Sequence, residues 1–232
     1  MSFLPPITLS KLTISVLFRR IIIIRDTTPH SAALNMAMDE ALLAAVTEPT
    51  LRVYRWEKEA VSFGYFTRLA AVAPHWPGRE LVRRMTGGGI VPHGTDFTYS
   101  FIIPSAHPFS QLPPRESYQR IHAALAGWLA RNAIATTIAA QPTGTGNGVC
   151  FESPAEYDLV AGGGKIAGAA QRRTRDGLLH QGSVQIPQLD TTTFAAAFAG
   201  ECEPQAIPEE TQRAADALAF SKYATAAWTE RV

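Results

Sequence analysis

The chain has 232 residues, of which 46% are hydrophobic and 18% charged, a balance typical of a globular protein with a sizeable core. Its formal net charge is only +1, which argues against a protein built mainly to bind nucleic acid, because such proteins usually carry a strong basic excess. The two cysteines form no Cys-x-x-Cys pair and are too few for a disulfide framework, so a reducing, cytoplasmic location is expected.

The N-terminal stretch Leu12–Ile24 is apolar, but Arg19 and Arg20 interrupt it and it is too short to span a bilayer. Its charges lie inside the apolar run and not ahead of it, which is unlike a signal peptide. We therefore expect no membrane segment, a buried strand at Ile21–Ile24, and a poorly ordered extension over residues 1–20. No linker divides the chain, so one domain over residues 1–232 is expected.

Hydrophobic periodicity predicts the main elements in chain order. Two amphipathic helices are expected, at Ser31–Val46 and at Ser117–Arg131, because apolar residues recur there at the helical period. Short apolar or alternating runs predict strands at Leu51–Trp56, Ala60–Phe66, Leu81–Met85, Phe97–Ile103 and Leu178–Ile186. The first two of these strands are expected to pair with each other.

A hairpin is expected after the flexible, glycine-rich loop Gln141–Gly148. Its strands are Tyr157–Val160 and Lys165–Gln171, joined by a glycine turn. The tail from Pro208 onward is alanine-rich and is expected to be helical. Because strands and helices follow one another without a regular βαβ alternation, the pattern indicates an α+β fold on a mixed, mostly antiparallel sheet packed with helices.

Three consecutive glycines, Gly87, Gly88 and Gly89, follow the predicted strand at Leu81–Met85. Such a loop lets the backbone approach a ligand closely and point N–H groups at an oxyanion. It matches neither a Walker A loop nor a GxGxxG motif. A plain glycine turn explains the loop equally well.

Cys150 and Lys165 stand on either side of the predicted hairpin turn. A free cysteine is usually a small buried hydrophobe, and a lysine after a turn is usually solvated. The functional alternative is a nucleophilic thiol whose pKa is lowered by a nearby cation. The small residues that follow the lysine, Ile166–Ala170, favour a crevice and hence this alternative. Cys202 lacks an activating context and is expected to be structural or on the surface.

His93 and His180 are candidate bases, or else hydrogen-bonded loop histidines. No His and Cys residues cluster at metal-ligand spacing, so no metal site is predicted. No Ser-His-Asp arrangement can be read from the spacing, since Ser100 and Ser183 are lone strand residues.

Several separated motifs resemble, in the same order, those of the family that includes lipoate–protein ligases and octanoyltransferases. The motifs are Asn35–Ala41, Val61–Phe66, Arg83–Gly89 with His93, Lys165–Gln171 and Lys222–Trp228. The resemblance implies the family's biotin/lipoate-ligase-like α+β fold. The segment Val149–Pro154 is most similar to the LipM-type branch, the octanoyl-[acyl-carrier-protein]:protein octanoyltransferases, where the cysteine at this position carries the acyl group.

The resemblance implies Cys150 and Lys165 as the catalytic residues, with His180 as a candidate base. It also implies the substrate-binding residues Arg84, Gly87, Gly88, Gly89, His93, Gly168 and Ala169. Some positions depart from the family pattern. Thr67 stands where the family commonly has Gln, Gly94 follows His93 where Asp is common, the full triple glycine is more ligase-like, and His180 stands one place early.

The implied activity moves an octanoyl chain from acyl carrier protein, through a Cys150 thioester, to a lysine of a lipoyl-domain protein (glycine cleavage H protein or the E2 of a 2-oxoacid dehydrogenase), without a cofactor. The alternative is an ATP-dependent lipoate–protein ligase, which would use ATP and Mg²⁺ and leave Cys150 incidental. A free acid must be activated before it forms an amide, whereas a thioester is already activated, so a cysteine has a purpose only in the transferase. A third alternative is a non-catalytic acyl- or biotinyl-binding module. Neither a nucleic acid nor a membrane is an expected partner.

Overall fold

The computed structural model describes residues 16–140, 154–186 and 192–231. Cys150 and the predicted loop Gln141–Gly148 therefore lie outside the described residues, as does most of the predicted N-terminal extension. The last residues of that extension, Phe18–Arg20, belong to a strand, so the prediction is wrong for them. Phe18 belongs in the strand because its side chain is buried against Phe101 and Phe109.

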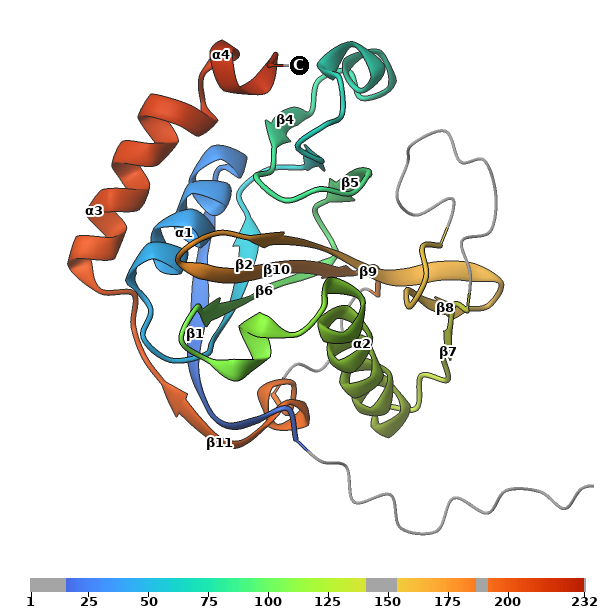
Figure 1. Ribbon diagram of the computed structural model, residues 1–232. Coiled ribbons are helices and arrows are strands. Elements are labelled where there is room, and N and C mark those ends of the chain that lie inside the picture. The colour runs from blue at the N-terminus through green and yellow to red at the C-terminus, as the bar shows by residue number, and fades with distance from the viewer. Residues whose placement is uncertain (1–15, 141–153, 187–191, 232) are drawn as a thin grey trace, which may run out of the picture.

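A mixed sheet of eight described strands runs through the molecule (Figure 1). Its order is β11-β1-β2-β6-β10-β9-β8-β7. The strands are β1 (Phe18–His30), β2 (Thr50–Trp56), β6 (Phe97–Pro104), β7 (Thr137–Ile138), β8 (Leu159–Ala161), β9 (Gly164–Arg173), β10 (Gly177–Val184) and β11 (Ala199–Pro204). β1 runs parallel to β2 and β11, and the other neighbours are antiparallel. The predicted mixed, mostly antiparallel sheet is thus confirmed.

A second sheet has the order β4-β3-β5, from β3 (Ala60–Phe63), β4 (Glu80–Arg83) and β5 (Ile90–His93). The predicted pairing of the strand at Leu51–Trp56 with that at Ala60–Phe66 is wrong, because β2 pairs with β1 and β6 while β3 joins this small sheet. The amide of Glu57 donates to the carbonyl of His30 at 2.9 Å. This bond continues the pairing of β1 with β2 past the end of β2, so no tight hairpin back to β2 forms.

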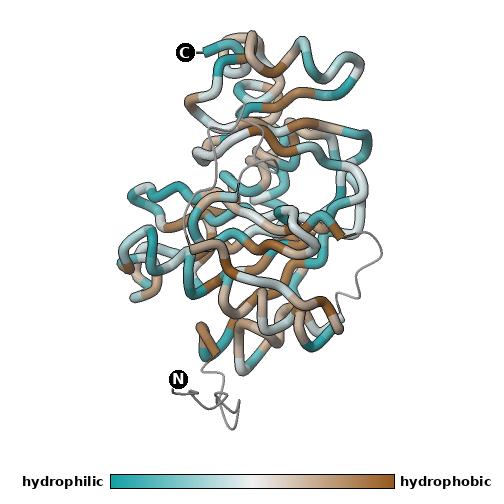
Figure 2. The backbone as a smooth tube through the Cα atoms, turned by 90° about the vertical axis from the view of Figure 1, so that its right-hand side faces the viewer, coloured by the Kyte–Doolittle hydropathy of each residue, from teal (hydrophilic) through white to brown (hydrophobic). Residues whose placement is uncertain are grey.

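Helices cover both faces of the large sheet (Figure 1). Helix α1 (Ala32–Ala45) packs on the face that carries Ile22 and Ile24, and α2 (Pro114–Arg131) packs on the face that carries Ile21 and Ile23. Alternation along β1 therefore buries one isoleucine pair in each of two cores. Helix α3 (Glu209–Leu218) packs outside α1. The hydrophobic strands run through the middle of the molecule (Figure 2).

The helix predictions are confirmed, with one shifted boundary. The Ser31 hydroxyl accepts from the amide of Leu34 at 3.3 Å and caps α1, as expected of serine at a helix start. Helix α2 begins earlier than predicted, at Pro114, because proline suits the first helical turn. The remaining helical segments are the 3₁₀ turns Leu69–Ala71, Ala73–His75, Pro108–Gln111 and Ala195–Ala197, the π-helical turn Ala219–Tyr223, and α4 (Ala226–Thr229).

Three of the described strands were not predicted, and one of them is the two-residue β7 (Thr137–Ile138). β11 is an edge strand whose residues are mostly exposed, and its sequence Ala-Gly-Glu-Cys-Glu-Pro has no apolar alternation. β5 is short and contains Pro92. Across the described ranges, no helix combines the length and the apolar character needed to traverse a bilayer.

Candidate functional site

A narrow pocket, which we call the central pocket, lies between α1, the small sheet and the large sheet. Its walls are mostly aromatic, aliphatic or glycine positions, with a few polar side chains among them. The lining residues are Met36, Tyr54, Trp56, Ser62, Arg84, Gly88, Val91, His93, Thr98, Gly168, Ala169, Ala170, Gln181, Gly182 and Ser183. Its cavity volume is about 30 Å³, room for only two or three water molecules at roughly 10–15 Å³ each. A ligand larger than a few water molecules can therefore enter only if the lining side chains move apart.

Arg84 holds the loop Gly87–Gly89, which we call the glycine loop, at one wall of the central pocket. Its buried guanidinium donates to the carbonyl oxygens of Gly87 and Gly89, both at 3.0 Å, and to the Ser62 hydroxyl at 2.7 Å. Gly88, between them, has φ +84°, a conformation that favours glycine. The loop thus wraps around a fixed cation, and Gly88 faces the pocket.

A second set of hydrogen bonds ties the same loop to α1. The Thr86 hydroxyl donates to Gln181 Oε1 at 2.7 Å, and Gln181 Nε2 donates to Asp39 Oδ2 at 2.8 Å. Asp39 and Thr86 are fully buried and Gln181 nearly so. Buried, fully bonded polar chains of this kind hold their members in one arrangement. The glycine loop is therefore positioned from both sheets.

Replacing Gly64 by alanine is expected to lower the free energy of unfolding by about 1–3 kcal/mol, as overpacking typically does. A Cβ at Gly64 would stand 1.9 Å from the Gly88 carbonyl oxygen, so the glycine loop would have to move. Gly87→Ala is the matched control, because a Cβ there meets no heavy atom within 4 Å. Urea unfolding of both variants checks this. Equal midpoints would contradict the close packing of the loop.

Lys165 is buried at the edge of the central pocket. Its Nζ lies 2.7 Å from Asp158 Oδ2, and the two side chains are 1% and 0% exposed. A Cβ at Gly168 would stand 2.3 Å from Cε and 2.5 Å from Nζ of the lysine. Glycine at this pocket-lining position therefore makes room for the lysine side chain. The crevice predicted from the small residues after Lys165 is confirmed, and part of it is filled by the lysine itself.

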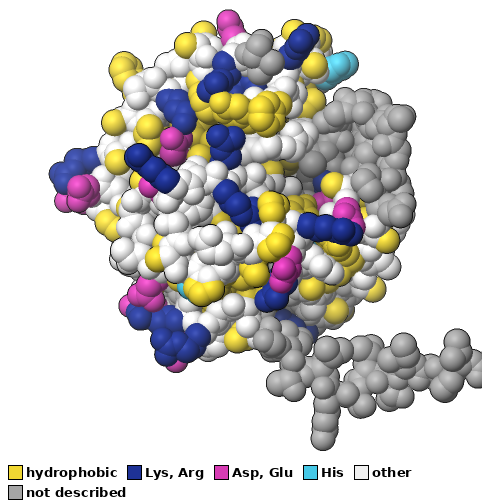
Figure 3. All heavy atoms as spheres, in the orientation of Figure 1, with side chains coloured by type: hydrophobic (Ala, Val, Ile, Leu, Met, Phe, Trp, Pro, Cys, Tyr) yellow, Lys and Arg dark blue, Asp and Glu magenta, His cyan; other side chains and the backbone are white. Residues whose placement is uncertain are grey.

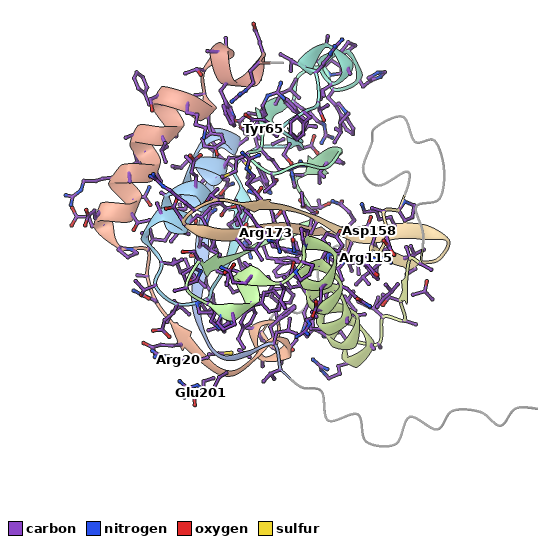
Figure 4. The ribbon with its side chains drawn as sticks, viewed as in Figure 1. Arg20, Tyr65, Arg115, Asp158, Arg173 and Glu201 are labelled. Carbon is purple, nitrogen blue, oxygen red and sulfur yellow. The ribbon has the colours of Figure 1, made fainter. Side chains whose placement is uncertain are left out.

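Asp158 directly precedes β8 and lies close to α2 (Figure 4), and its carboxylate binds several neighbouring groups. Besides Lys165, its carboxylate accepts from the Tyr118 hydroxyl at 2.5 Å and from the Ala155 amide at 2.6 Å. Burial, followed by the charge of Asp158, raises the pKa of Tyr118 well above its usual value, so the phenol stays protonated and donates. The carboxylate is thus held in one place, and it holds the ammonium of Lys165.

His93 lies in the central pocket between two polar partners. Its Nε2 is 2.7 Å from the Ser62 hydroxyl and its Nδ1 is 2.8 Å from Asp96 Oδ2. The imidazole stacks on Trp56, with ring centroids 4.0 Å apart at 16°. Three contacts therefore fix the ring in one orientation.

His180 is not brought to the central pocket. Adjacent strand residues face opposite sides of a sheet, so Gln181 faces the pocket while His180 points toward α2. There its buried ring packs against Tyr99, Tyr118 and His122. Burial lowers the pKa of His180 well below its usual range, so the ring is neutral. The structure therefore gives His180 no contact with the pocket.

The other residues predicted from the sequence mostly come together. Those lining the central pocket are Arg84, Gly88, His93, Gly168 and Ala169. Gly87 and Gly89 flank Gly88 in the loop held by Arg84, Lys165 adjoins the pocket, and Cys150 lies outside the described residues. Cys202 is exposed, as predicted. In the parts of the chain that the structure describes, no group of three His, Cys, Asp or Glu side chains could hold a metal ion.

Several polar residues of the site were missed from the sequence, among them Ser62, Asp96, Asp158 and Gln181. Asp158 carried no signal from strand register, because Lys165 pairs with Val160 and its side chain reaches Asp158 only by passing over Gly168. Ser62 carried none, since its contact with His93 depends on β3 pairing with β5, about thirty residues away in the chain.

The chain is similar to known proteins over most of its length. The model of the lipoyl protein ligase A/B catalytic domain matches residues 31–214. Octanoyltransferase LipM of Oceanobacillus iheyensis is 40% identical over 172 residues, which cover 69% of this chain and 62% of that protein. The LipM of Staphylococcus aureus is 37% identical over 166 residues, covering 65% of this chain and 60% of that protein. The match thus spans about three fifths of the length of these relatives.

The fold is also that of a solved structure. Lipoate-protein ligase A bound with ATP superposes with a TM-score of 0.68 at 20% identity, covering 92% of this chain and 98% of that chain. This likeness supports the predicted α+β fold packed with helices. With its catalytic-domain model matched from residue 31 to residue 214, the chain belongs to the lipoyl protein ligase A/B catalytic domain family.

Proposed function

We propose that this protein is an octanoyltransferase of protein lipoylation, a cytoplasmic enzyme whose catalytic domain occupies residues 1–232. It moves an octanoyl chain from acyl carrier protein to Cys150, and from Cys150 to a lysine of a lipoyl-domain protein. The acceptor is the glycine cleavage H protein or the E2 subunit of a 2-oxoacid dehydrogenase. The observation that carries the proposal is Lys165, buried with Asp158 at the edge of the central pocket.

The first step places the acyl chain in the central pocket. Most of the pocket lining is apolar or small, but the cavity of about 30 Å³ is far smaller than an octanoyl chain. Met36 is the pocket-lining side chain best suited to yield, because methionine is unbranched and adapts its shape. Octanoyl binding therefore includes a repacking around Met36.

The second step is transfer to the thiol. Cys150 attacks the thioester carbonyl as a thiolate, and the ammonium of Lys165 stabilises the thiolate and the oxyanion that follows. Asp158 accepts from Lys165 at 2.7 Å, which suits an ammonium that supplies charge better than a neutral amine that removes a proton. Thiol-to-thiol exchange is nearly isoenergetic and the final attack by an amine runs downhill, so the reaction needs no ATP.

Two carrier proteins have to dock in turn, and a surface near the central pocket suits an acidic partner. Arg172 and Arg231 both lie over the Tyr65 ring, at 5.1 Å and 4.6 Å from its centroid, and the neighbouring Phe66 is 76% exposed. Basic and hydrophobic side chains gather in this upper region of the molecular face (Figure 3), where Tyr65 is labelled in Figure 4. We assign this surface to the octanoyl carrier protein.

The test is intact mass spectrometry of the protein after incubation with octanoyl carrier protein without ATP. One octanoyl group is expected on the wild type and none on Cys150→Ala. Cys202→Ala, which removes the exposed second thiol, should still be acylated. An adduct of the same yield on Cys150→Ala would overturn the proposal.

The same assay separates the alternatives. Transfer of free lipoate or octanoate that requires ATP and Mg²⁺, without an adduct, would indicate a lipoate–protein ligase in which Lys165 and Gly87–Gly89 hold an acyl-adenylate. Retention of a ligand with neither adduct nor transfer would indicate a binding module.

A further inference from the structure

The central pocket contains a serine, a histidine and an aspartate in hydrogen-bonded order. Ser62 Oγ is 2.7 Å from His93 Nε2, and His93 Nδ1 is 2.8 Å from Asp96 Oδ2. Ser62 lies on β3, His93 ends β5, and Asp96 lies in the turn to β6. Ser62 pairs with Val91, so His93, two residues further along β5, lies on the same face as Ser62. The arrangement is that of a nucleophile, its base and the group that orients the base.

The hydrogen bonds indicate which atom donates and which accepts at each contact between Ser62, His93 and Asp96. Burial would raise the pKa of Asp96, but the adjacent imidazole and the hydrogen bonds that the carboxylate accepts outweigh burial and lower the pKa to about 2. Asp96 is therefore ionised at neutral pH and accepts from His93 Nδ1–H. In the tautomer that carries its proton on Nδ1, His93 Nε2 accepts from the Ser62 hydroxyl.

Arg84 completes the environment of the serine. Its guanidinium donates to Ser62 Oγ at 2.7 Å, so the serine oxygen accepts from a cation while its proton points at a base. Negative charge that develops on this oxygen is stabilised by Arg84. Asp96 is held by Thr98 and Ser183, at 2.9 Å and 2.6 Å. Asp96, which orients the base, is thus fixed from β6 and β10, and the serine is fixed by Arg84, which directly follows β4.

Ser62 and His93 both line the central pocket. We propose that Ser62 is a second nucleophile of this pocket, which gives the protein a slow hydrolytic activity on activated acyl esters. The choice of acyl esters as substrates rests on the proposed function, because that function places an acyl chain in the pocket.

The steps balance with water as the co-reactant. Ser62 Oγ bonds to the acyl carbonyl carbon and its proton passes to His93 Nε2; the bond to the leaving alkoxide or phenolate breaks, and the leaving group takes that proton. Water then attacks the Ser62 ester and gives a proton to His93. The bond to Oγ breaks, the fatty acid leaves and Ser62 regains its proton.

The test uses Cys150→Ala protein, so that the thiol contributes nothing, with p-nitrophenyl acetate and p-nitrophenyl octanoate as probes. Adding Ser62→Ala or His93→Gln is expected to lower enzyme-dependent hydrolysis about a hundredfold or more. Adding Ser110→Ala, a buried serine that bonds only backbone carbonyls and a glutamine, should leave the hydrolysis unchanged.

A fluorophosphonate probe gives a readout that needs no change at Ser62. Peptide mass spectrometry of labelled Cys150→Ala protein should find the phosphonyl group on Ser62. Labelling of no serine, or hydrolysis that Ser62→Ala leaves intact, would overturn the inference. The octanoyl adduct on Cys150 of the wild type, measured alongside, reports on the proposed function separately, so either idea can fail without the other.

Discussion

Replacing Lys165 by methionine is expected to lower the rate of octanoyl transfer at least about a hundredfold, the size of effect seen when one stabilising donor is removed from a site where negative charge develops. The side chain is 1% exposed, so water cannot take over its role. Rates are measured with octanoyl carrier protein as donor and a lipoyl domain as acceptor. Lys222→Met is the matched control, because Lys222 also pairs with a carboxylate, Glu40 at 2.6 Å, but lies outside the central pocket.

A loss of folding has to be separated from a loss of chemistry in this variant. Lys165→Met leaves the buried Asp158 carboxylate without its cation, which typically costs about 3–5 kcal/mol of stability. The double variant Lys165→Met with Asp158→Asn removes both charges and should recover most of that stability while transfer stays low. Recovery of transfer together with stability would show that Lys165 has only a structural role.

Replacing Arg52 by methionine is expected to destabilise the fold by about 3–5 kcal/mol, because it takes the guanidinium away from two buried carboxylates. Arg52 is fully buried, and its guanidinium donates to Asp26 Oδ2 at 2.6 Å and to Asp39 Oδ1 at 2.9 Å. It also donates to the backbone and side-chain oxygens of Asn35, at 3.1 Å and 2.8 Å. Urea unfolding measures the change. Arg115→Met, at an exposed arginine, is the control and should not move the midpoint.

The Arg52 variant also links stability to the site. Asp39 holds Gln181, which holds Thr86 beside the glycine loop. We expect Arg52→Met to impair transfer at temperatures where the protein is still folded. A destabilised variant with full transfer activity would show that Asp39 is not needed to position the loop.

Local sequence signals predicted those elements whose burial follows a simple period. Ser31–Val46 has both a helical apolar stripe and a capping serine, and α1 forms there. β11 was missed because an edge strand need not alternate, and β2 was paired wrongly because register is decided by partners far along the chain. The glycine hairpin before Lys165 was predicted because both of its strands are adjacent in sequence.

The sequence by itself determined the family and the two helices on the sheet. It also singled out Lys165, the triple glycine, Arg84 and His93, which stand in short motifs whose residue types are visible without a fold. Only the tertiary structure decided what these groups can do. It paired Lys165 with Asp158, turned His180 away from the pocket, and set Ser62 beside His93. The physical reason is that hydrogen bonds and ion pairs act over about 3 Å, and strand pairing alone brings residues tens of positions apart within that distance.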